Sequence, residues 1–528
     1  MSKKYILTLL LTLLCLVQFS CKDEFEKFPT NPNVAGEAGA VPPEYLLRQI
    51  LTDVRAGTDQ TEEPFSSISR INQYTTGLTF PLYGGSNLYN WTTTNDTYGW
   101  IRNVNKLEEN ATRAIGKTNN TYLSLSKFLK VYSYVWLTQR VGDVPVLEAG
   151  KGLENPTPKF DTQEDIYLYA LNTLDEVNKE LGEIAKNVNA VRINGDIYYA
   201  GNVLAWRRAI NAYTLRTLIN LSKRADDTPK LQIKERFAKI ISSPTDYPIF
   251  RDNADNWNFT FLPVTNRYPT QFLRLYALET TVSKTYMDIL VQNKDPRTFI
   301  SASPAPGQIT QGKKIDDFSA YNGSDNSRPQ GQLFTESDGT KGLYSYVNYN
   351  RYFRGPDFIP EVYIICGYSE MCFNIAEAAN RGWINVNAEN FYLDGIRSSL
   401  RFYGIAQGTK LPISNGTGVA LGEATADVET FLKNVAYKTN KDDALKQILE
   451  QKYVAFWQNS GWEPFYQYRR TGVPAFREGS GTNSQGKIPM RWLYPVREVI
   501  NNADNARAAI DRQFGGKDDI FAKMWLLK

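Results

Sequence analysis

The sequence of 528 residues contains no histidine. Without an imidazole the chain cannot form a Ser-His-Asp or Cys-His nucleophile system. It also lacks the common imidazole ligand of zinc and the usual side chain for proton transfer near neutral pH. Hydrolysis by a pair of carboxyl groups remains open, because glycosidases need only two acidic side chains. The missing histidines therefore narrow the possible enzyme classes without excluding an enzyme.

Cysteines and long hydrophobic runs are also scarce. Two of the 4 cysteines, Cys366 and Cys372, lie in one predicted helix, Glu361–Arg381. Six helical positions separate them by about 9 Å along the axis. This exceeds the roughly 7 Å limit for a disulfide, so we expect two buried free thiols. After the first twenty residues, no apolar run is long enough for a transmembrane helix.

Neither sign of charge predominates, whereas aromatic residues are abundant. The chain has 60 Lys and Arg against 56 Asp and Glu, and no basic block. Residues 1–20 hold two lysines and no acid, so the net charge falls from +4 to +2 without them. This distribution does not indicate a nucleic-acid partner. The 32 Tyr, 26 Phe and 10 Trp suit either large packing layers or a surface that stacks on a polar ligand.

The N-terminus has the pattern of a secretion signal. Lys3 and Lys4 precede the apolar stretch Tyr5–Val17, which is too short to cross a bilayer, and Ser20-Cys21 follows. This resembles a bacterial lipoprotein signal, so we interpret residues 1–20 as the signal peptide and Cys21 as the lipidated residue. Residues 21–42 are interpreted as a tether. Their acidic start, residues 22–26, resembles a signal for export to the cell surface, although a solvated tether has the same composition.

Residues 43–528 are predicted to form a single domain of amphipathic helices. Asp161-Thr162 before Glu164 and Asp165 is typical of a helix N-terminus. The helical spacing of apolar residues predicts these helices: Pro43–Ala56, Tyr98–Ile115, Tyr122–Arg140, Thr162–Leu181, Asn202–Arg224, Leu231–Ile241, Glu361–Arg381, Ala388–Tyr403 and Asp442–Gln458.

Several predicted helices are neighbours joined by short connections. An alanine-rich helix ending at Gly382, followed by an aromatic-rich helix from Asn387, is typical of a tetratricopeptide helix pair. Other possible pairs are 122–140 with 162–181 and 202–224 with 231–241. The predicted fold class is therefore mainly α, with tetratricopeptide-like helix pairs packed against an irregular, loop-rich side.

Two loop-rich insertions, near residues 77–97 and 301–360, interrupt the helical pattern and are candidates for ligand binding. A saccharide ring lays its C–H patches on aromatic faces, while its hydroxyls need amide, carboxylate or guanidinium partners. Both regions combine such groups. The candidate ligand-binding residues are Trp91, Tyr83, Asn95 and Asp96 in the first region, and Tyr346, Tyr349 and Arg351 in the second.

Six features in order resemble the SusD/RagB family of outer-membrane nutrient-binding lipoproteins over nearly the whole mature chain. Besides the lipoprotein signal they are Arg140-Val-Gly-Asp-Val-Pro145, Glu370 to Gly382 with Ala376-Glu377-Ala378, Gln451-Lys452-Tyr453 leading to Gly461-Trp462-Glu463, Arg469-Arg470-Thr471-Gly472-Val473-Pro474, and Arg491-Trp492-Leu493-Tyr494-Pro495 leading to Asn501-Asn502. The Arg-Arg-Thr-Gly-Val-Pro form is most similar to the subgroup described as starch-binding and associating with the outer membrane.

The resemblance implies a fold, a location and partners. It implies tetratricopeptide-like pairs, a lipid-anchored protein at the outer membrane that is exposed on the cell surface, and a SusC-like TonB-dependent transporter as partner. It further implies a non-catalytic binder of oligosaccharides with no cofactor. The motif residues Arg469, Arg470, Gly472 and Pro474 are interpreted as structural, because arginines pair with acids or cap carbonyls and Gly and Pro end helices.

Alternative functions stay open at this point. A peptide-binding member of the same family would also use aromatic residues, and a helical scaffold for other lipoproteins needs no ligand. A carboxylate-dependent surface glycoside hydrolase could use Glu370 and Glu377. Seven helical positions, however, place their backbones about 10 Å apart, which favours packing roles. Asp252 with Asp255, and Asp325 with Asn326, carry oxygen ligands that calcium accepts, but their spacing favours solvated turns.

The sequence makes one testable prediction about the binding residues. If Trp91 stacks on a ligand, Trp91→Ala should weaken binding by about 1–3 kcal/mol, borrowing the scale of aromatic–base stacking, which is roughly five- to two-hundred-fold in affinity. The melting temperature should hardly change. A buried Trp91 would instead cost about 3–5 kcal/mol of stability on truncation. Affinity and melting temperature measured on the same variant separate the two roles.

Overall fold

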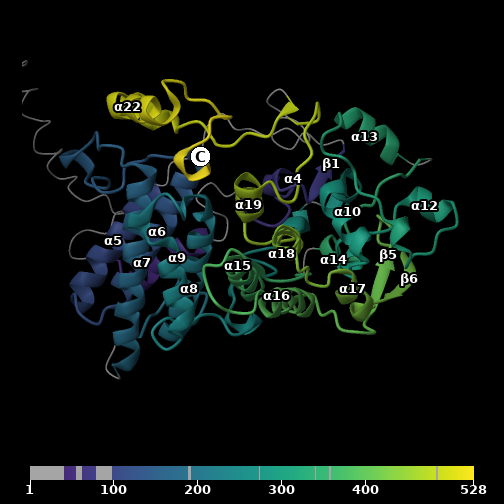
Figure 1. The fold of residues 1–528 in the computed structure, drawn as a ribbon, viewed down its shortest axis with the longest axis horizontal. Helices are drawn as coiled ribbons and strands as arrows, with labels where there is room; N and C mark the ends of the chain where they lie inside the picture. The colour runs from purple at the N-terminus through teal and green to yellow at the C-terminus, as the bar shows by residue number, and fades with distance from the viewer. Residues whose placement is uncertain are drawn as a thin grey trace, which may run out of the picture.

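The computed structural model describes residues 41–54, 62–78, 98–187, 192–272, 274–338, 341–355, 358–482 and 486–528, and these are mainly helical (Figure 1). The helices up to residue 293 are α3 (Pro43–Val54), α4 (Ser67–Ile71), α5 (Tyr98–Ile115), α6 (Thr121–Val141), α7 (Gln163–Lys186), α8 (Val203–Asn220), α9 (Ile233–Ser242) and α10 (Lys284–Asn293). Those that follow are α11 (Thr298–Ser301), α12 (Pro306–Thr310), α13 (Gln330–Ser337), α14 (Tyr349–Tyr352), α15 (Tyr368–Asn380), α16 (Ala388–Phe402), α17 (Val428–Asn434), α18 (Lys441–Ala455), α19 (Glu463–Thr471), α21 (Val496–Asn501) and α22 (Ala503–Phe514).

The described strands form three antiparallel two-stranded pairs. They are β1 (Thr75–Gly77) with β3 (Thr280–Val282), β2 (Trp257–Phe259) with β4 (Tyr363–Cys366), and β5 (Lys410–Ser414) with β6 (Ala420–Thr425). Sheets this small cannot build a core of their own. They join helices and loops instead, and the predicted mainly α fold class is confirmed.

Eight of the nine predicted helices are present, one of them, Tyr98–Ile115, with the predicted ends and seven with shifted ends. Local caps explain where several of them begin. Thr162 caps α7 by accepting a hydrogen bond from the Asp165 backbone N–H, as predicted, while Asp161 accepts bonds from the Val146 and Leu147 backbones instead. Asn202 caps α8 in the same way. Each cap satisfies a backbone donor that the first turn leaves without a partner.

The predicted helix Glu361–Arg381 is wrong in its first part. Residues Tyr363–Cys366 form strand β4, which pairs with β2, and α15 begins only at Tyr368. A short apolar run rich in Ile and aromatic residues fits either a buried strand or a helix. Here the side chain of Asn256 accepts the Tyr368 backbone N–H and fixes the helix start. Cys366 and Cys372 therefore lie on different elements, and both are buried free thiols as expected.

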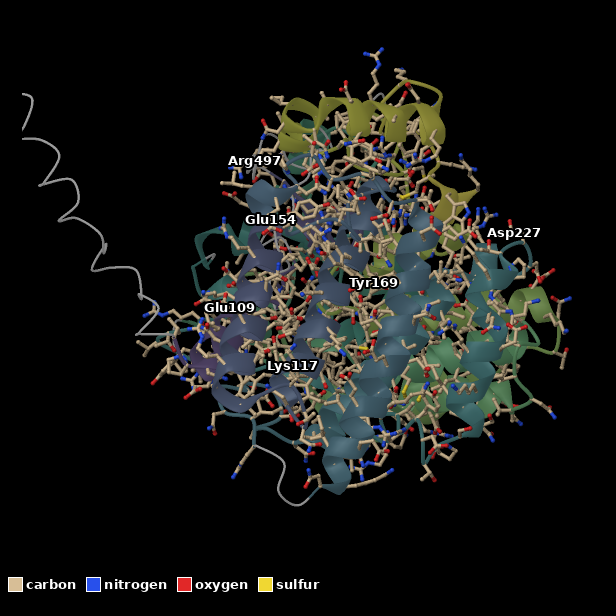
Figure 2. The ribbon with its side chains drawn as sticks, turned by 90° about the vertical axis from the view of Figure 1, so that its left-hand side faces the viewer. Glu109, Lys117, Glu154, Tyr169, Asp227 and Arg497 are labelled. Atoms are coloured by element: carbon tan, nitrogen blue, oxygen red, sulfur yellow. The ribbon has the colours of Figure 1, made fainter. Side chains whose placement is uncertain are left out.

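Helices α5 to α9 pack side by side, each against the next, on one side of the molecule (Figure 1). Figure 2 views this side face on, with α22 across its top. Helix α6 is buried on almost every face, whereas α5 keeps an exposed charged face that includes Glu109. A helix that is covered on all sides belongs to an inner layer, and an amphipathic one to the surface. The tetratricopeptide-like stacking predicted from the helix pairs is thus confirmed.

The pair α15 and α16 forms the middle of the molecule together with α18 (Figure 1). Gly395 on α16 faces the ring of Phe373 on α15, and a Cβ at this glycine would lie 2.8 Å from the ring. Only glycine lets the two backbones approach this closely. Buried Ala376 and Ala378 on α15 serve the same purpose.

The region 301–360 is more ordered than a loop-rich insertion suggests. It contains α12, α13 and α14, and isolated bridges join Thr281 to Tyr346 and Ala302 to Val347. Leu78, Leu333, Tyr344 and Tyr346 form a small core of their own beneath it. This side, to the right in Figure 1, is therefore held by short elements around a satellite core.

The C-terminal motifs lock the end of α6 in place. The Arg140 guanidinium lies over the rings of Trp136, Trp462 and Trp492, at 3.7, 4.7 and 4.6 Å from their centroids. Arg469 donates to the carbonyl oxygens of Gln139 and Met490. The structural interpretation of Arg469 is therefore correct, because its donors cap backbone carbonyls in the interior.

Two carboxylates of α15 are paired with arginines in the interior. Glu370 accepts hydrogen bonds from Arg216 on α8, and Glu377 accepts from both Arg470 on α19 and Arg381 at the end of α15. Burial alone would raise the pKa of Glu377, but the guanidinium of Arg470 and its neighbours lower it to about 2. The packing role expected for Glu370 and Glu377 agrees with these contacts.

None of the described helices combines the length and the apolar character that a bilayer crossing requires.

Glu377 should stabilise the fold in a pH-dependent way. Removing one partner of a buried ion pair costs about 3–5 kcal/mol, so we expect Glu377→Gln to lower the free energy of unfolding by that amount near neutral pH. The folded-state pKa of about 2 lies below the ordinary 4.5. The stabilisation is therefore complete above pH 4.5 and is lost as the pH falls through the folded-state pKa.

Urea unfolding of both proteins from about pH 6 to about pH 2 measures this effect. The difference in stability between wild type and Glu377→Gln should shrink towards acid. Glu183→Gln removes an exposed carboxylate that pairs only with exposed Lys186, and this control should unfold like the wild type. A difference that stays constant with pH would contradict the assignment.

Candidate functional site

The candidate site is a cavity of about 620 Å³ on the loop-rich side of the molecule. Four parts of the fold meet there. They are the end of the β1–β3 pair where Leu78 and Glu279 lie, α12, the end of α13, and the β5–β6 hairpin. The lining residues are Leu78, Leu278, Glu279, Pro304, Pro306, Ile309, Phe334, Ser337, Asp338, Gly342, Tyr346, Asn415, Gly416, Thr417 and Leu421. Its size is that of a small-ligand pocket.

The backbone ladder of β1 and β3 brings the first wall together. The Leu78 N–H donates to the Glu279 carbonyl at 2.8 Å, which extends the pairing of Gly77 with Thr280 by one step. Leu78 is buried in the satellite core. Leu78 belongs to the predicted binding region near residues 77–97, and residues 79–97 lie outside the described part of the chain.

Tyr346 is the predicted binding residue that the structure places in the cavity lining. Its ring is mostly buried, and its hydroxyl hydrogen-bonds to the Ser337 carbonyl at 3.2 Å and to the Ser337 hydroxyl at 3.0 Å. Bonds to α13 and to the satellite core fix the ring. Tyr346 therefore forms part of a fixed wall of the cavity and exposes only a small part of its surface to a ligand.

The hairpin closes over this wall through glycine. A Cβ at Gly416 would lie 2.7 Å from Tyr346 Cδ2 and 2.9 Å from Leu278 Cδ2, which is closer than packed side chains allow. Asn415 forms the turn by accepting hydrogen bonds from the backbone N–H groups of Thr417 and Val419. An Asn-Gly turn between strands is a strong hairpin signal in sequence.

Within the part of the chain that the structure describes, two carboxylates line the cavity and no lysine or arginine does so. Asp338 is exposed at the end of α13. Glu279 is half-buried, and its Oε2 atom is buried without a hydrogen-bond partner within the part of the chain that the structure describes. Most other lining side chains are apolar. The cavity thus offers hydrogen-bond acceptors in apolar surroundings, which suits a ligand that carries donors.

Tyr349 and Arg351 lie on α14, outside the cavity lining. Tyr349 stacks on Phe353 with ring centroids 6.2 Å apart. Arg351 donates to Glu361 at 2.6 and 3.1 Å, and this ion pair is largely buried. The attraction of Glu361 outweighs the effect of burial and raises the pKa of Arg351 above its usual value. The Arg351 guanidinium therefore already has a carboxylate partner inside the protein.

The other predicted site residues, Trp91, Tyr83, Asn95, Asp96 and the lipidation site Cys21, lie outside the described residues. The cavity contains residues that sequence reasoning missed. Glu279, Phe334 and the hairpin residues 415–417 are brought together by pairings between distant segments. The Asn415-Gly416 turn signal could have indicated the hairpin, whereas nothing local distinguishes Glu279 from a surface acid.

The acidic turns considered for calcium are occupied by protein partners. Asp252 is exposed, but Asp255 is buried and accepts hydrogen bonds from Arg251 and from Arg208 on α8, so the solvated interpretation is wrong for Asp255. Asp325 accepts from Ser327 and Arg477. The solvated interpretation is also wrong for Asn326, which is fully buried and bonded to Ser283 and to the Thr75 carbonyl. Among the described residues, no group of three or more acids or cysteines is arranged to hold a metal ion.

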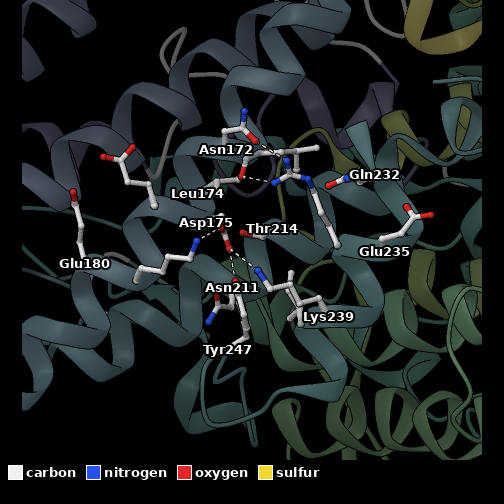
Figure 3. A pocket seen from close by; sticks show the side chains of 15 residues that line it. Asn172, Leu174, Asp175, Glu180, Asn211, Thr214, Gln232, Glu235, Lys239 and Tyr247 are labelled. Carbon is white, nitrogen blue, oxygen red and sulfur yellow. Dashed lines mark hydrogen bonds and ion pairs between the residues drawn. The ribbon is translucent and has the colours of Figure 1, made fainter. Parts of the chain in front are cut away.

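A second cavity, of about 530 Å³, lies between α7, α8 and α9 on the helical side (Figure 3). Its polar side chains largely satisfy one another. Asp175 accepts from the Tyr247 hydroxyl and pairs with Lys239, while Arg236 donates to Asn172 at 2.6 Å. This groove is a junction between stacked helices, and the loop-side cavity is the stronger candidate for ligand binding.

The comparisons with known proteins agree with this arrangement. The family model described as starch-binding associating with the outer membrane, SusD-like, matches residues 37–495. Among curated proteins, none matches the chain. A SusD homologue of Bacteroides fragilis is 30% identical with a TM-score of 0.75, covering 92% of this chain and 99% of the other.

Two further solved structures are similar. An outer-membrane protein of Bacteroides vulgatus, described as involved in nutrient binding, is 28% identical with a TM-score of 0.76, covering 92% of this chain and 100% of the other. A chitin-binding protein is 22% identical with a TM-score of 0.68, covering 92% of this chain and 99% of the other. At this lower identity, the likeness shows the fold alone.

The contact between Gly416 and Tyr346 should be sensitive to one added methyl group. We expect Gly416→Ala to lower the free energy of unfolding by about 1–3 kcal/mol, because the new Cβ overpacks the ring. Gly331→Ala is the matched control. Gly331 lies on α13 in the same region with nothing near a built Cβ, and alanine should be neutral or stabilising there. Equal behaviour of both variants in urea unfolding would show that the hairpin does not pack as described.

Proposed function

The chain belongs to the SusD-like family of nutrient-binding proteins that associate with the outer membrane, and on this premise we propose that it captures oligosaccharides without cleaving them. The observation that carries the proposal is the loop-side cavity, which combines a fixed aromatic wall, apolar side chains and carboxylate acceptors. Sugar rings need both apolar and hydrogen-bonding surface. We further propose that the predicted residues Trp91, Tyr83, Asn95 and Asp96, which lie outside the described residues, contact the same ligand with more groups of both kinds.

The proposal of binding without catalysis has physical support. The chain has no histidine, and Glu370 and Glu377 are held in interior ion pairs. Glu279 and Asp338 line one cavity, so a glycosidase must still be tested.

Delivery and anchoring complete the proposed role. A protein held by a lipid on Cys21 cannot itself move cargo across a membrane, and no described helix could span one. Captured oligosaccharide must therefore pass to a transporter, and we propose a SusC-like TonB-dependent barrel as the partner at the cell surface. The peptide-binding alternative uses the same kind of cavity and differs only in cargo.

A library of oligosaccharides and peptides tests the cargo. The purified protein should bind members of the oligosaccharide set, and prolonged incubation should release no new reducing ends. Binding confined to peptides would replace the proposed cargo. Turnover that is abolished by Glu279→Gln or Asp338→Asn would overturn the non-catalytic role.

A separate prediction concerns the anchor and the transporter. Cys21→Ala should release the protein from outer-membrane fractions of a strain that lacks the transporter, because one lipid attachment is the proposed anchor. The wild-type protein should co-purify with a TonB-dependent barrel from mild detergent extracts. A variant that stays in the membrane fraction of that strain would show that another segment anchors the chain.

A further inference from the structure

Glu279 differs from the other buried acids of the described chain. Of the carboxylate oxygens buried in that part, its Oε2 atom alone has no hydrogen-bond partner. Glu370, Glu377 and Asp255 all accept from arginines. A buried carboxylate oxygen without a partner loses its hydration and gains nothing in return. Glu279 lines the loop-side cavity and is half-buried, so a ligand in the cavity meets the charge of a partly desolvated carboxylate.

Among the described residues, the charged side chains that line the cavity are both acidic, Glu279 and Asp338. Lys341 follows Asp338 closely in sequence, but it is exposed and outside the lining.

We propose that the cavity selects its saccharide by charge, with Glu279 as the specificity-determining residue. It takes a neutral or amino-bearing sugar unit that donates a hydroxyl or amino hydrogen to Glu279, and it rejects uronate and sulfated units. This inference rests on the proposed function, since it names the class of oligosaccharide that the same site binds.

The physical basis is the weak screening of charge in an apolar cavity. An anionic sugar group beside Glu279 meets a carboxylate of the same charge, and no described lysine or arginine of the lining offsets the repulsion. It also brings hydrogen-bond acceptors to a wall where donors are needed. A protonated amine brings both the donor and the opposite charge, and charge-assisted hydrogen bonds are the stronger kind. A neutral hydroxyl supplies the donor alone. The expected order of affinity is amino, then neutral, then carboxylate.

Two matched series of probes test the order. Maltohexaose and cellohexaose are each used in neutral, 6-amino-6-deoxy and 6-carboxy form, and their affinities are measured by calorimetry near neutral pH. In a series that binds, the amino form should bind at least about tenfold more tightly than the carboxy form. Glu279→Gln keeps the shape and removes the charge, so it should reduce this ratio about fivefold or more.

Glu235→Gln is the matched control, because it removes the same charge from the helical-side groove. It should leave the amino-to-carboxy ratio as in the wild type. If the neutral forms bind but the carboxy form binds equally well, or if Glu279→Gln leaves the ratio unchanged, charge selection is overturned and the proposed function stands. If no probe binds and the oligosaccharide library also fails, the proposed function falls, and the inference falls with it.

Discussion

The buried ion pairs of α15 are the interaction on which the rest of the architecture depends. Arg216 reaches Glu370 from α8, and Arg470 reaches Glu377 from α19. Each of these charges would be costly to bury alone, so every pair requires its helices to stay together. Because α8 belongs to the stacked helices and α19 to the C-terminal part, α15 links both. Segments about 150 and 90 positions apart are thereby held in one arrangement.

The same pairing separates stability from function. Glu370 and Glu377 are buried and paired with arginines, so they are not available to a ligand or for proton transfer. The aromatic side chains of the helical body are buried as well. On the loop-rich side the elements are short, and the satellite core around Tyr344 and Tyr346 supports them. A rigid helical body carrying a site on short irregular segments is a common division of roles, since loops can vary while the body stays fixed.

Helices were predictable from sequence because their signals are local. Periodicity and caps such as Thr162 lie within a few residues of the helix that they define. The failures are contacts between distant segments. Strand β4 exists because β2 pairs with it, and Asp255 is buried because Arg208 approaches from α8. For the site, Tyr346 was predicted as a ligand-binding residue from the composition of its region, and it lies in the cavity lining. Glu279 was missed because only the β1–β3 pairing and the hairpin make its position special.

Glu279 differs from several buried acids of the described chain, because those acids are paired with arginines. The fold provides an arginine for Glu370 and for Glu377, and it places a guanidinium against Asp255 even in a turn. Among the buried carboxylate oxygens of the described residues, Oε2 of Glu279 is the one without a donor, and Glu279 lies at the wall of a cavity. Local exceptions of this kind are expected where function requires them. The partly desolvated charge of Glu279 therefore favours a ligand that brings a hydrogen-bond donor or a positive charge to the cavity wall.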